Sequence, residues 1–166
     1  PLIEAYIELT LDSDTQTYDD PRVMEAIELL RGSQTMIFLA LMNPGHLASS
    51  PAGDGAAVKV VGEIAEWAAA AGLRVALYPH AGMWMESVKD ANRIAEKVDR
   101  ANVGICFNLC HTLMVDGEES VVGLARSAWP YLFVVTINGA DADGKDWGTL
   151  IQPLDRGTYD VSALLQ

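Results

Sequence analysis

The chain has 166 residues, of which half are hydrophobic and 20% are charged, and its formal net charge is -12. This length and composition are typical of a globular domain with a substantial core and exclude a disordered chain. The acidic balance, with no cluster of Lys and Arg, argues against nucleic acid or an anionic membrane surface as a partner. No apolar run approaches the roughly 20 residues of a membrane span.

The first 55 residues contain two predicted strands and one helix. Residues 3–11 alternate imperfectly between apolar and polar side chains and are predicted to form a strand. Asp20 and Pro21 then supply a helix start, and the helix is expected to end before Gly32. Residues 35–42 are an unbroken apolar run, which is typical of a strand covered on both faces. A loop rich in Pro, Gly and Ser follows over residues 43–55, and loops of this length often carry function.

The remaining residues continue the alternation of strands and helices. An Ala-rich helix is predicted over residues 56–71, and Ser87 with Asp90 resembles a capping box that opens the next helix. A third helix is predicted over residues 118–128. Three short apolar runs rich in β-formers are predicted to form strands over residues 75–80, 104–110 and 133–138. The tail is expected to hold a short strand within residues 150–160 and a last helical turn over residues 161–165.

The two cysteines, Cys106 and Cys110, lie on one predicted strand. Four residues of extended chain span about 13 Å. A disulfide needs Cα atoms within about 7 Å, so these thiols are not expected to bridge each other. The chain begins at Pro1 rather than at a Met, so the sequence leaves open whether the protein works in the cytoplasm or the periplasm.

Polar side chains follow three of the predicted strands at the point where each apolar run stops. Tyr78 and His80 end one run, Asn108 and His111 end the next, and Asn138 ends the third. In a parallel α/β sheet or barrel the carboxyl ends of the strands meet at one mouth, which is where such folds bind ligands. The sequence therefore predicts a binding site at this edge. On length alone an open sheet fits better than a full barrel, which usually needs about 200 residues or more.

The order and spacing of these motifs resemble the xylose-isomerase-like TIM barrels, the sugar phosphate isomerase/epimerase family. In that family one strand ends in Glu-x-His, and a later one ends in Asp-Thr-x-His after an Asn-Val-Gly approach. A strand with a polar end pointing into the mouth follows, and the chain closes on Gly-Glu-Gly followed by Asp. The corresponding segments here are 77–80, 102–104, 108–111, 136–138 and 155–160.

This resemblance implies an incomplete parallel (β/α) TIM-barrel-like fold holding about strands 3–8 of 8. Residues 1–166 would form a single partial (β/α)8-barrel domain, with residues 3–11 as the third strand and the N-terminal strands outside the sequence. An incomplete barrel leaves a strand edge open. We expect that edge to be covered by a missing N-terminal segment or by another copy of the chain in a homo-oligomer.

The resemblance also implies where a divalent metal would bind. The family holds its metal with Glu, Asp, His and a second Glu, and the corresponding positions here are Tyr78, Asn108, Thr136 (or Asn138) and Arg156. A hard divalent cation prefers anionic oxygen ligands, and Arg has no lone pair to give. Two histidines alone rarely hold a metal. We therefore expect no metal and no other cofactor.

The candidate site residues each have a structural alternative. His80 and His111 are candidate catalytic acid/base groups, or else buried histidines bonded to backbone. Asn108 and Asn138 suit hydroxyl recognition, because an amide both donates and accepts, but Asn also caps turns. The remaining candidate substrate-binding residues are Tyr78, Trp84 and Arg156. Tyr78 is expected to line the mouth, and Trp84 either lines the pocket or belongs to the core. Arg156 either binds an anionic group of the substrate or pairs with a neighbouring Asp.

The sequence thus indicates a sugar or sugar phosphate isomerase/epimerase-like enzyme that acts by proton transfer next to a carbonyl, without the family metal. The expected partner is a small-molecule sugar, with neither nucleic acid nor a membrane involved. The alternative is a barrel that binds a sugar or sugar acid without catalysis, which the neutral residues at the metal positions favour.

Overall fold

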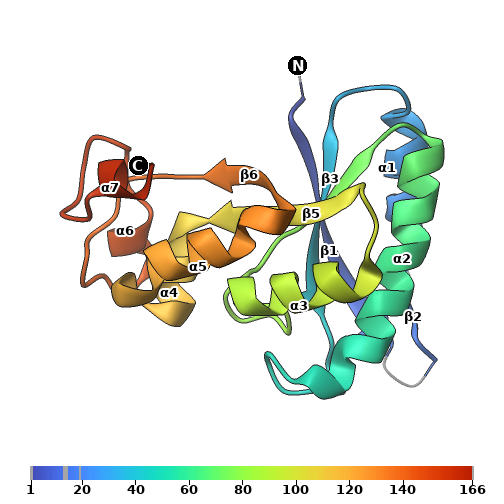
Figure 1. Ribbon diagram of the computed structural model, residues 1–166, viewed down its shortest axis with the longest axis horizontal. Helices are drawn as coiled ribbons and strands as arrows, with labels where there is room; N and C mark the ends of the chain where they lie inside the picture. Colours follow the sequence, from blue (N-terminus) through green and yellow to red (C-terminus); the bar gives the residue numbers. More distant parts are fainter. Residues whose placement is uncertain (1, 13–14, 19, 166) are drawn as a thin grey trace.

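Five parallel strands form the centre of the fold, in the computed structural model that describes residues 2–12, 15–18 and 20–165. The sheet order is β2-β1-β3-β4-β5-β6, and only β2 runs antiparallel, where it pairs with Leu11 and Asp12. The strands turn strongly along the sheet, so that β5 and β6 run across the direction of β1 (Figure 1). The strands are β1 (Glu4–Asp12), β2 (Thr17–Tyr18), β3 (Met36–Met42), β4 (Arg74–Leu77), β5 (Val103–Asn108) and β6 (Leu132–Thr136).

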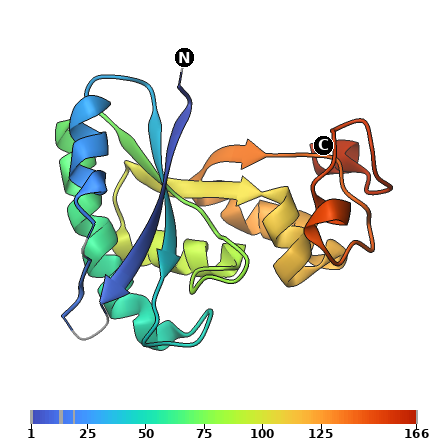
Figure 2. The same ribbon diagram turned by 180° about the vertical axis from the view of Figure 1, so that it is seen from behind.

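Helices alternate with the strands along the chain. Helices α1, α2 and α3 lie on one side of the sheet, and α4, α6 and α7 lie beyond the tips of β5 and β6 (Figures 1 and 2). No helix among the described residues is long and apolar enough to cross a membrane. The helices are α1 (Arg22–Leu29), α2 (Asp54–Ala70), α3 (Val88–Val98), α4 (Leu109–Asp116), α5 (Val121–Ala128), α6 (Trp147–Leu150) and α7 (Val161–Leu164), with short 3₁₀ turns at Pro51–Gly53, Glu118–Ser120 and Trp129–Tyr131.

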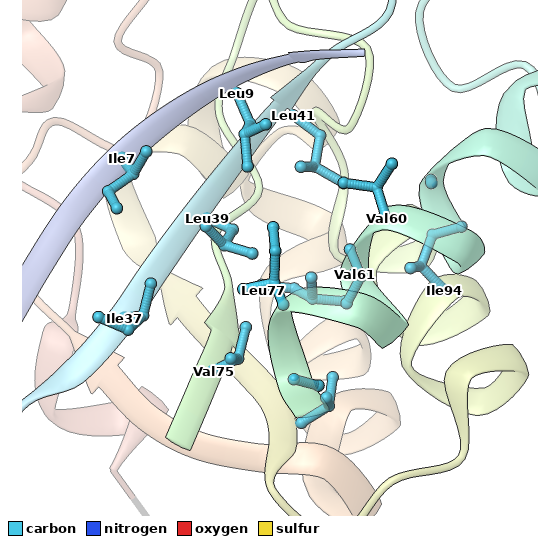
Figure 3. Close-up of a cluster of buried hydrophobic side chains, with 14 of the residues drawn as sticks. Ile7, Leu9, Ile37, Leu39, Leu41, Val60, Val61, Val75, Leu77 and Ile94 are labelled. Carbon is cyan, nitrogen blue, oxygen red and sulfur yellow. The ribbon is translucent and has the colours of Figure 1, made fainter. Parts of the chain in front are cut away.

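Alternate residues of the strands separate two faces of the sheet. On β3, Ile37, Leu39 and Leu41 belong to the main core, to which α2 contributes Val61 (Figure 3). The residues of opposite parity, such as Phe38, face the concave side and form a smaller cluster. Because β3 is buried on both faces, its sequence is an unbroken apolar run. The concave cluster also packs against Tyr78 and therefore leads directly to the carboxyl ends of the strands.

The expected fold class is confirmed, and several element ends differ from the expected ones. The strand expected over 75–80 ends at Leu77, and the strand expected over 104–110 ends at Asn108, where α4 begins. Asn108 ends the strand because its side chain caps the helix by accepting the backbone N–H of His111. Cys110 and His111 therefore lie on the first helical turn. The short strand expected in the tail is a single bridge between Gly139 and Gln152, and β2 was not expected.

The long loop before α2 is held to α3 by a buried network of charges. Asp54 opens α2, is only 4% exposed, and accepts hydrogen bonds from Arg93 and Lys97 of α3. Arg93 also pairs with the buried Asp90, which in turn accepts the hydroxyl of Ser49 in the loop. The capping box predicted from Ser87 and Asp90 is confirmed, so the same aspartate caps α3 and anchors the loop.

Candidate functional site

A cluster of aromatic and imidazole rings lies where β4 and β5 end. The rings of His80 and His111 are 4.1 Å apart between centroids, and the ring of Tyr78 is 6.2 Å from the first and 5.6 Å from the second. Tyr78 and His80 follow the last residue of β4, whereas His111 is presented by the first turn of α4. The two segments that the sequence singled out therefore deliver their side chains to one place.

Both histidines are oriented by the backbone of Ala81. The Nδ1 atom of His80 lies 3.0 Å from the carbonyl oxygen of Ala81, which accepts hydrogen bonds only, so this Nδ1 carries the proton. The backbone N–H of Ala81 donates to Nδ1 of His111 at 3.2 Å, so that Nδ1 carries none. In their neutral forms, His80 thus presents a bare Nε2 and His111 presents an Nε2–H. The pair combines one proton acceptor with one proton donor.

Burial determines the charge of His111. The residue is only 8% exposed, and burial, followed by the nearby His80, lowers its pKa to about 4. At neutral pH His111 is therefore uncharged and acts as a hydrogen-bond donor through Nε2. Burial likewise raises the pKa of Tyr78, so its hydroxyl keeps its proton over the same range.

We predict that His111 makes stability depend on pH. The pKa of this histidine is about 4 in the folded protein, below the ordinary 6.5, so the unfolded chain binds the extra proton between these values. The contribution of His111 to the free energy of unfolding is fully present above pH 6.5 and is lost as the pH falls towards 4. The expected loss of unfolding free energy is about 1 to 3 kcal/mol, because the imidazole edge is partly screened by solvent.

Urea unfolding of the wild type and of His111→Asn between pH 4 and pH 7.5 measures this effect. The Oδ1 atom of Asn can accept the Ala81 N–H in place of Nδ1, so the variant keeps the bond and removes the titration. The variant should lose stability less steeply below pH 6.5 than the wild type. His46→Asn, in the loop before α2, serves as the control and should keep the wild-type slope. Parallel slopes for wild type and His111→Asn would contradict the prediction.

The other residues predicted for the site lie at various distances from this cluster. Asn108 is buried and joins it directly, through a hydrogen bond of 2.6 Å from its Nδ2 to the hydroxyl of Tyr78. The side-chain amide of Asn138 donates to the carbonyl oxygens of Gly139 and Leu150, so it links the segment after β6 to α6. Arg156 is exposed in the tail, and its backbone packs against Gly139.

Trp84 lies in the core and not among the rings. It is 3% exposed and donates its indole N–H to the carbonyl of Ser50. Its ring edge and His46 line a separate pocket of about 190 Å³ between the loops that follow β3 and β4. The structure thus brings Tyr78, His80, Asn108 and His111 together. The binding roles of Trp84, Asn138 and Arg156 stay predictions.

Two residues of the cluster were missed from the sequence. Trp147 opens α6 and meets His111 edge to face at 5.2 Å, and it is 41% exposed. Tyr6 of β1 meets Tyr78 edge to face at 5.3 Å and donates its hydroxyl to Glu8. The capping box formed by Asp146 and Thr149 indicates a helix start in the sequence, but nothing in it indicates that Trp147 contacts His111.

The residues at the positions implied for a metal do not fit a hard divalent cation. The side-chain oxygen of Asn108 already accepts the N–H of His111 and the thiol of Cys110, and its nitrogen donates to Tyr78. Arg156 carries a positive charge. Within residues 2–12, 15–18 and 20–165 no group of three or more His, Cys, Asp and Glu side chains is placed to hold a metal ion.

The comparisons with known proteins give one family and a consistent fold. The family described as xylose isomerase-like TIM barrel matches residues 22–166. One similar solved structure is a probable 3-DHS dehydratase, AsbF, from Bacillus anthracis, with 15% identity, a TM-score of 0.71 and coverage of 98% of this chain and 65% of that chain. A second is 3-keto-D-glucoside 4-epimerase, YcjR, from E. coli, with 16% identity, a TM-score of 0.66 and coverage of 99% of this chain and 65% of that chain. A third is an IolI protein with a bound zinc atom, with 15% identity, a TM-score of 0.67 and coverage of 98% of this chain and 61% of that chain.

At these identities the likeness establishes the fold alone. No curated protein sequence matches the chain significantly. The chain spans less than two thirds of the length of these three structures, which agrees with an incomplete barrel.

Proposed function

Because the chain belongs to the xylose isomerase-like TIM barrel family, we propose that it is a carbohydrate isomerase or epimerase that moves a proton bound to the carbon next to a carbonyl. The single observation that carries this proposal is the pair of histidines with opposite tautomers. His80 offers a bare Nε2 as the base, and His111 offers an N–H donor 4.1 Å away between ring centroids. A base and a donor side by side suit removal of a carbon-bound proton.

The proposed reaction uses these two groups in turn. Nε2 of His80 takes the proton from the carbon, the C–H electron pair becomes the carbon–carbon double bond of an enediolate, and the carbonyl electrons move to oxygen. His111, uncharged at neutral pH, donates its Nε2–H to that oxygen. In an isomerisation His80 then returns the proton to the former carbonyl carbon, while the hydroxyl proton of the neighbouring carbon moves to the former carbonyl oxygen, so that the isomer forms and atoms and charge balance over the cycle.

A carbohydrate with a carbonyl group is the proposed substrate. One similar structure is that of an epimerase of a keto-glucoside, which supports this class without naming the sugar. The exposed face of Trp147 beside His111 suits stacking against a sugar ring. We propose a small-molecule sugar as the partner, with no divalent metal in the reaction, because the amide of Asn108 and the hydroxyl oxygen of Tyr78 are already hydrogen-bonded and Arg156 is a cation.

Solvent exchange tests this proposal. The protein is incubated in D₂O with D-fructose, D-tagatose or dihydroxyacetone, and loss of the C–H signal next to the carbonyl is followed by proton NMR. Exchange above the uncatalysed rate supports the enzyme. A ketose that binds by calorimetry and does not exchange supports the second candidate, a non-catalytic sugar-binding barrel, which the neutral residues Tyr78 and Asn108 at the implied metal positions favour. A protein that neither binds nor exchanges any of these sugars contradicts both candidates.

A further inference from the structure

The hydroxyl of Tyr78 is held in one orientation by Asn108. The side-chain oxygen of Asn108 caps α4 by accepting the N–H of His111 at 3.2 Å, and it also accepts the thiol of Cys110 at 3.0 Å. Both partners are donors, so this atom must be the oxygen, and the amide nitrogen must face the other way. There it donates to the Tyr78 oxygen at 2.6 Å. The direction of the bond is thus set by the helix cap.

Because Tyr78 accepts this bond, its own proton is left to donate elsewhere. Among the described residues no acceptor is placed for that proton, although the side chain is half-buried. Accepting a hydrogen bond makes a hydroxyl a stronger donor, since hydrogen bonds in a chain polarise one another. Burial raises the pKa of Tyr78, so the group serves as a donor and not as a base at neutral pH.

The unpaired donor lies beside both histidines. The Tyr78 ring meets the His111 ring edge to face at 5.6 Å, and the His80 ring is 6.2 Å away. The site therefore gathers two N–H or O–H donors, from His111 and Tyr78, around one acceptor, Nε2 of His80. Two donors beside one base are a combination that can stabilise a developing oxyanion.

We propose, resting on the proton-transfer function above, that Tyr78 is a catalytic residue whose hydroxyl donates to the carbonyl oxygen of the substrate together with His111. When His80 removes the neighbouring proton, negative charge collects on that oxygen, and the two hydrogen bonds stabilise it. Asn108 is a positioning residue, because it acts through the direction it imposes on the Tyr78 hydroxyl.

Two variants test this assignment in the solvent-exchange assay, with EDTA present throughout. Tyr78→Phe removes the donor and should slow exchange about 10²–10³-fold. Asn108→Asp keeps the helix cap, because Asp caps as well as Asn, but its carboxylate accepts the Tyr78 proton and turns the bond round. It should slow exchange by a similar factor. Tyr18→Phe removes a tyrosine hydroxyl on β2, where the ring packs on Trp67 and not on the ring cluster, and it should stay within twofold of the wild type.

Two further measurements separate this assignment from a loss of folding. Circular dichroism and thermal midpoints establish that each variant folds. The tyrosine Raman doublet, taken as the difference from Tyr78→Phe, reports whether the Tyr78 hydroxyl donates or accepts. It should shift towards the donating form in Asn108→Asp, which a merely structural role of Asn108 would not cause.

Binding of glycolohydroxamate, an enediolate mimic, tests Tyr78 without turnover. Calorimetry should show at least tenfold weaker binding to Tyr78→Phe than to the wild type. Equal binding, or exchange by Tyr78→Phe within threefold of the wild type, would overturn the role of Tyr78 and leave the proposed function standing. If the wild type exchanges no ketose but binds the hydroxamate, and Tyr78→Phe loses that binding, catalysis is overturned and Tyr78 is supported as a carbonyl-binding donor. A wild type that neither exchanges nor binds the mimic overturns both.

Discussion

His80→Ala should slow the exchange of ketose protons with solvent by about 10²–10⁴-fold, the usual contribution of a general base. The side chain supplies the one bare imidazole nitrogen of the ring cluster, since its other nitrogen donates to Ala81 and Nε2 of His111 carries a proton. Its loss leaves the two donors, so binding of a ketose should weaken much less than the rate. The rate is measured by proton NMR in D₂O, and the dissociation constant by calorimetry.

His46→Ala is the matched control for this variant. His46 lies in the loop after β3, away from the ring cluster, and lines the separate pocket beside Trp84. Its removal should leave the exchange rate within twofold of the wild type. A His80→Ala protein that folds normally and still exchanges within threefold of the wild type would show that the base lies elsewhere. If only binding weakens and no form of the protein exchanges, the sugar-binding alternative holds.

The convergence of the site could be predicted from the sequence because it depends on strand order alone. Apolar runs that end in Tyr78, His80 and Asn108 predict parallel strands, and parallel strands bring their carboxyl ends together. Likewise the unbroken run over residues 35–42 predicts a strand buried on both faces, as β3 is. These inferences need only local patterns and the rule that crossovers are right-handed.

The protonation pattern of the site could not be predicted, because it depends on which backbone atoms meet each ring. The tautomers of His80 and His111 follow from the position of Ala81, which a turn after β4 sets. The amide of Asn138 was expected to face a ligand, but both of its hydrogens bond to backbone carbonyls. The contact of Trp147 with His111 depends on how the tail folds back, and no periodicity in the sequence encodes that.

The sequence does not single out Asp54, because a lone Asp at a helix start is usually an exposed residue that interacts favourably with the helix dipole. In the structure it is 4% exposed and holds two cations, with Arg93 Nε at 3.0 Å and Lys97 Nζ at 2.6 Å from the same oxygen. Removing one partner of a buried ion pair leaves an uncompensated charge. We therefore expect Asp54→Ala to be among the most destabilising single changes in the chain.

Asp54→Ala should lower the free energy of unfolding by about 3 kcal/mol, the lower end of the range for breaking a buried pair, because Lys97 remains half exposed. Urea unfolding at pH 7 measures this loss. Glu63→Ala is the control, since Glu63 pairs with Lys59 on the surface of α2 with both side chains more than 40% exposed, and it should cost less than about 0.5 kcal/mol.

A double-mutant cycle shows whether the loss comes from the stranded cation. Arg93→Met keeps much of the packing of the Arg stem, and Asp54→Ala combined with Arg93→Met should cost less than the sum of the two single changes by at least about 1 kcal/mol. Additive costs would mean that Asp54 stabilises α2 through its own helix and not through α3. In that case the attachment of the loop before α2 to α3 would depend on Ser49, whose hydroxyl donates to Asp90, and not on Asp54.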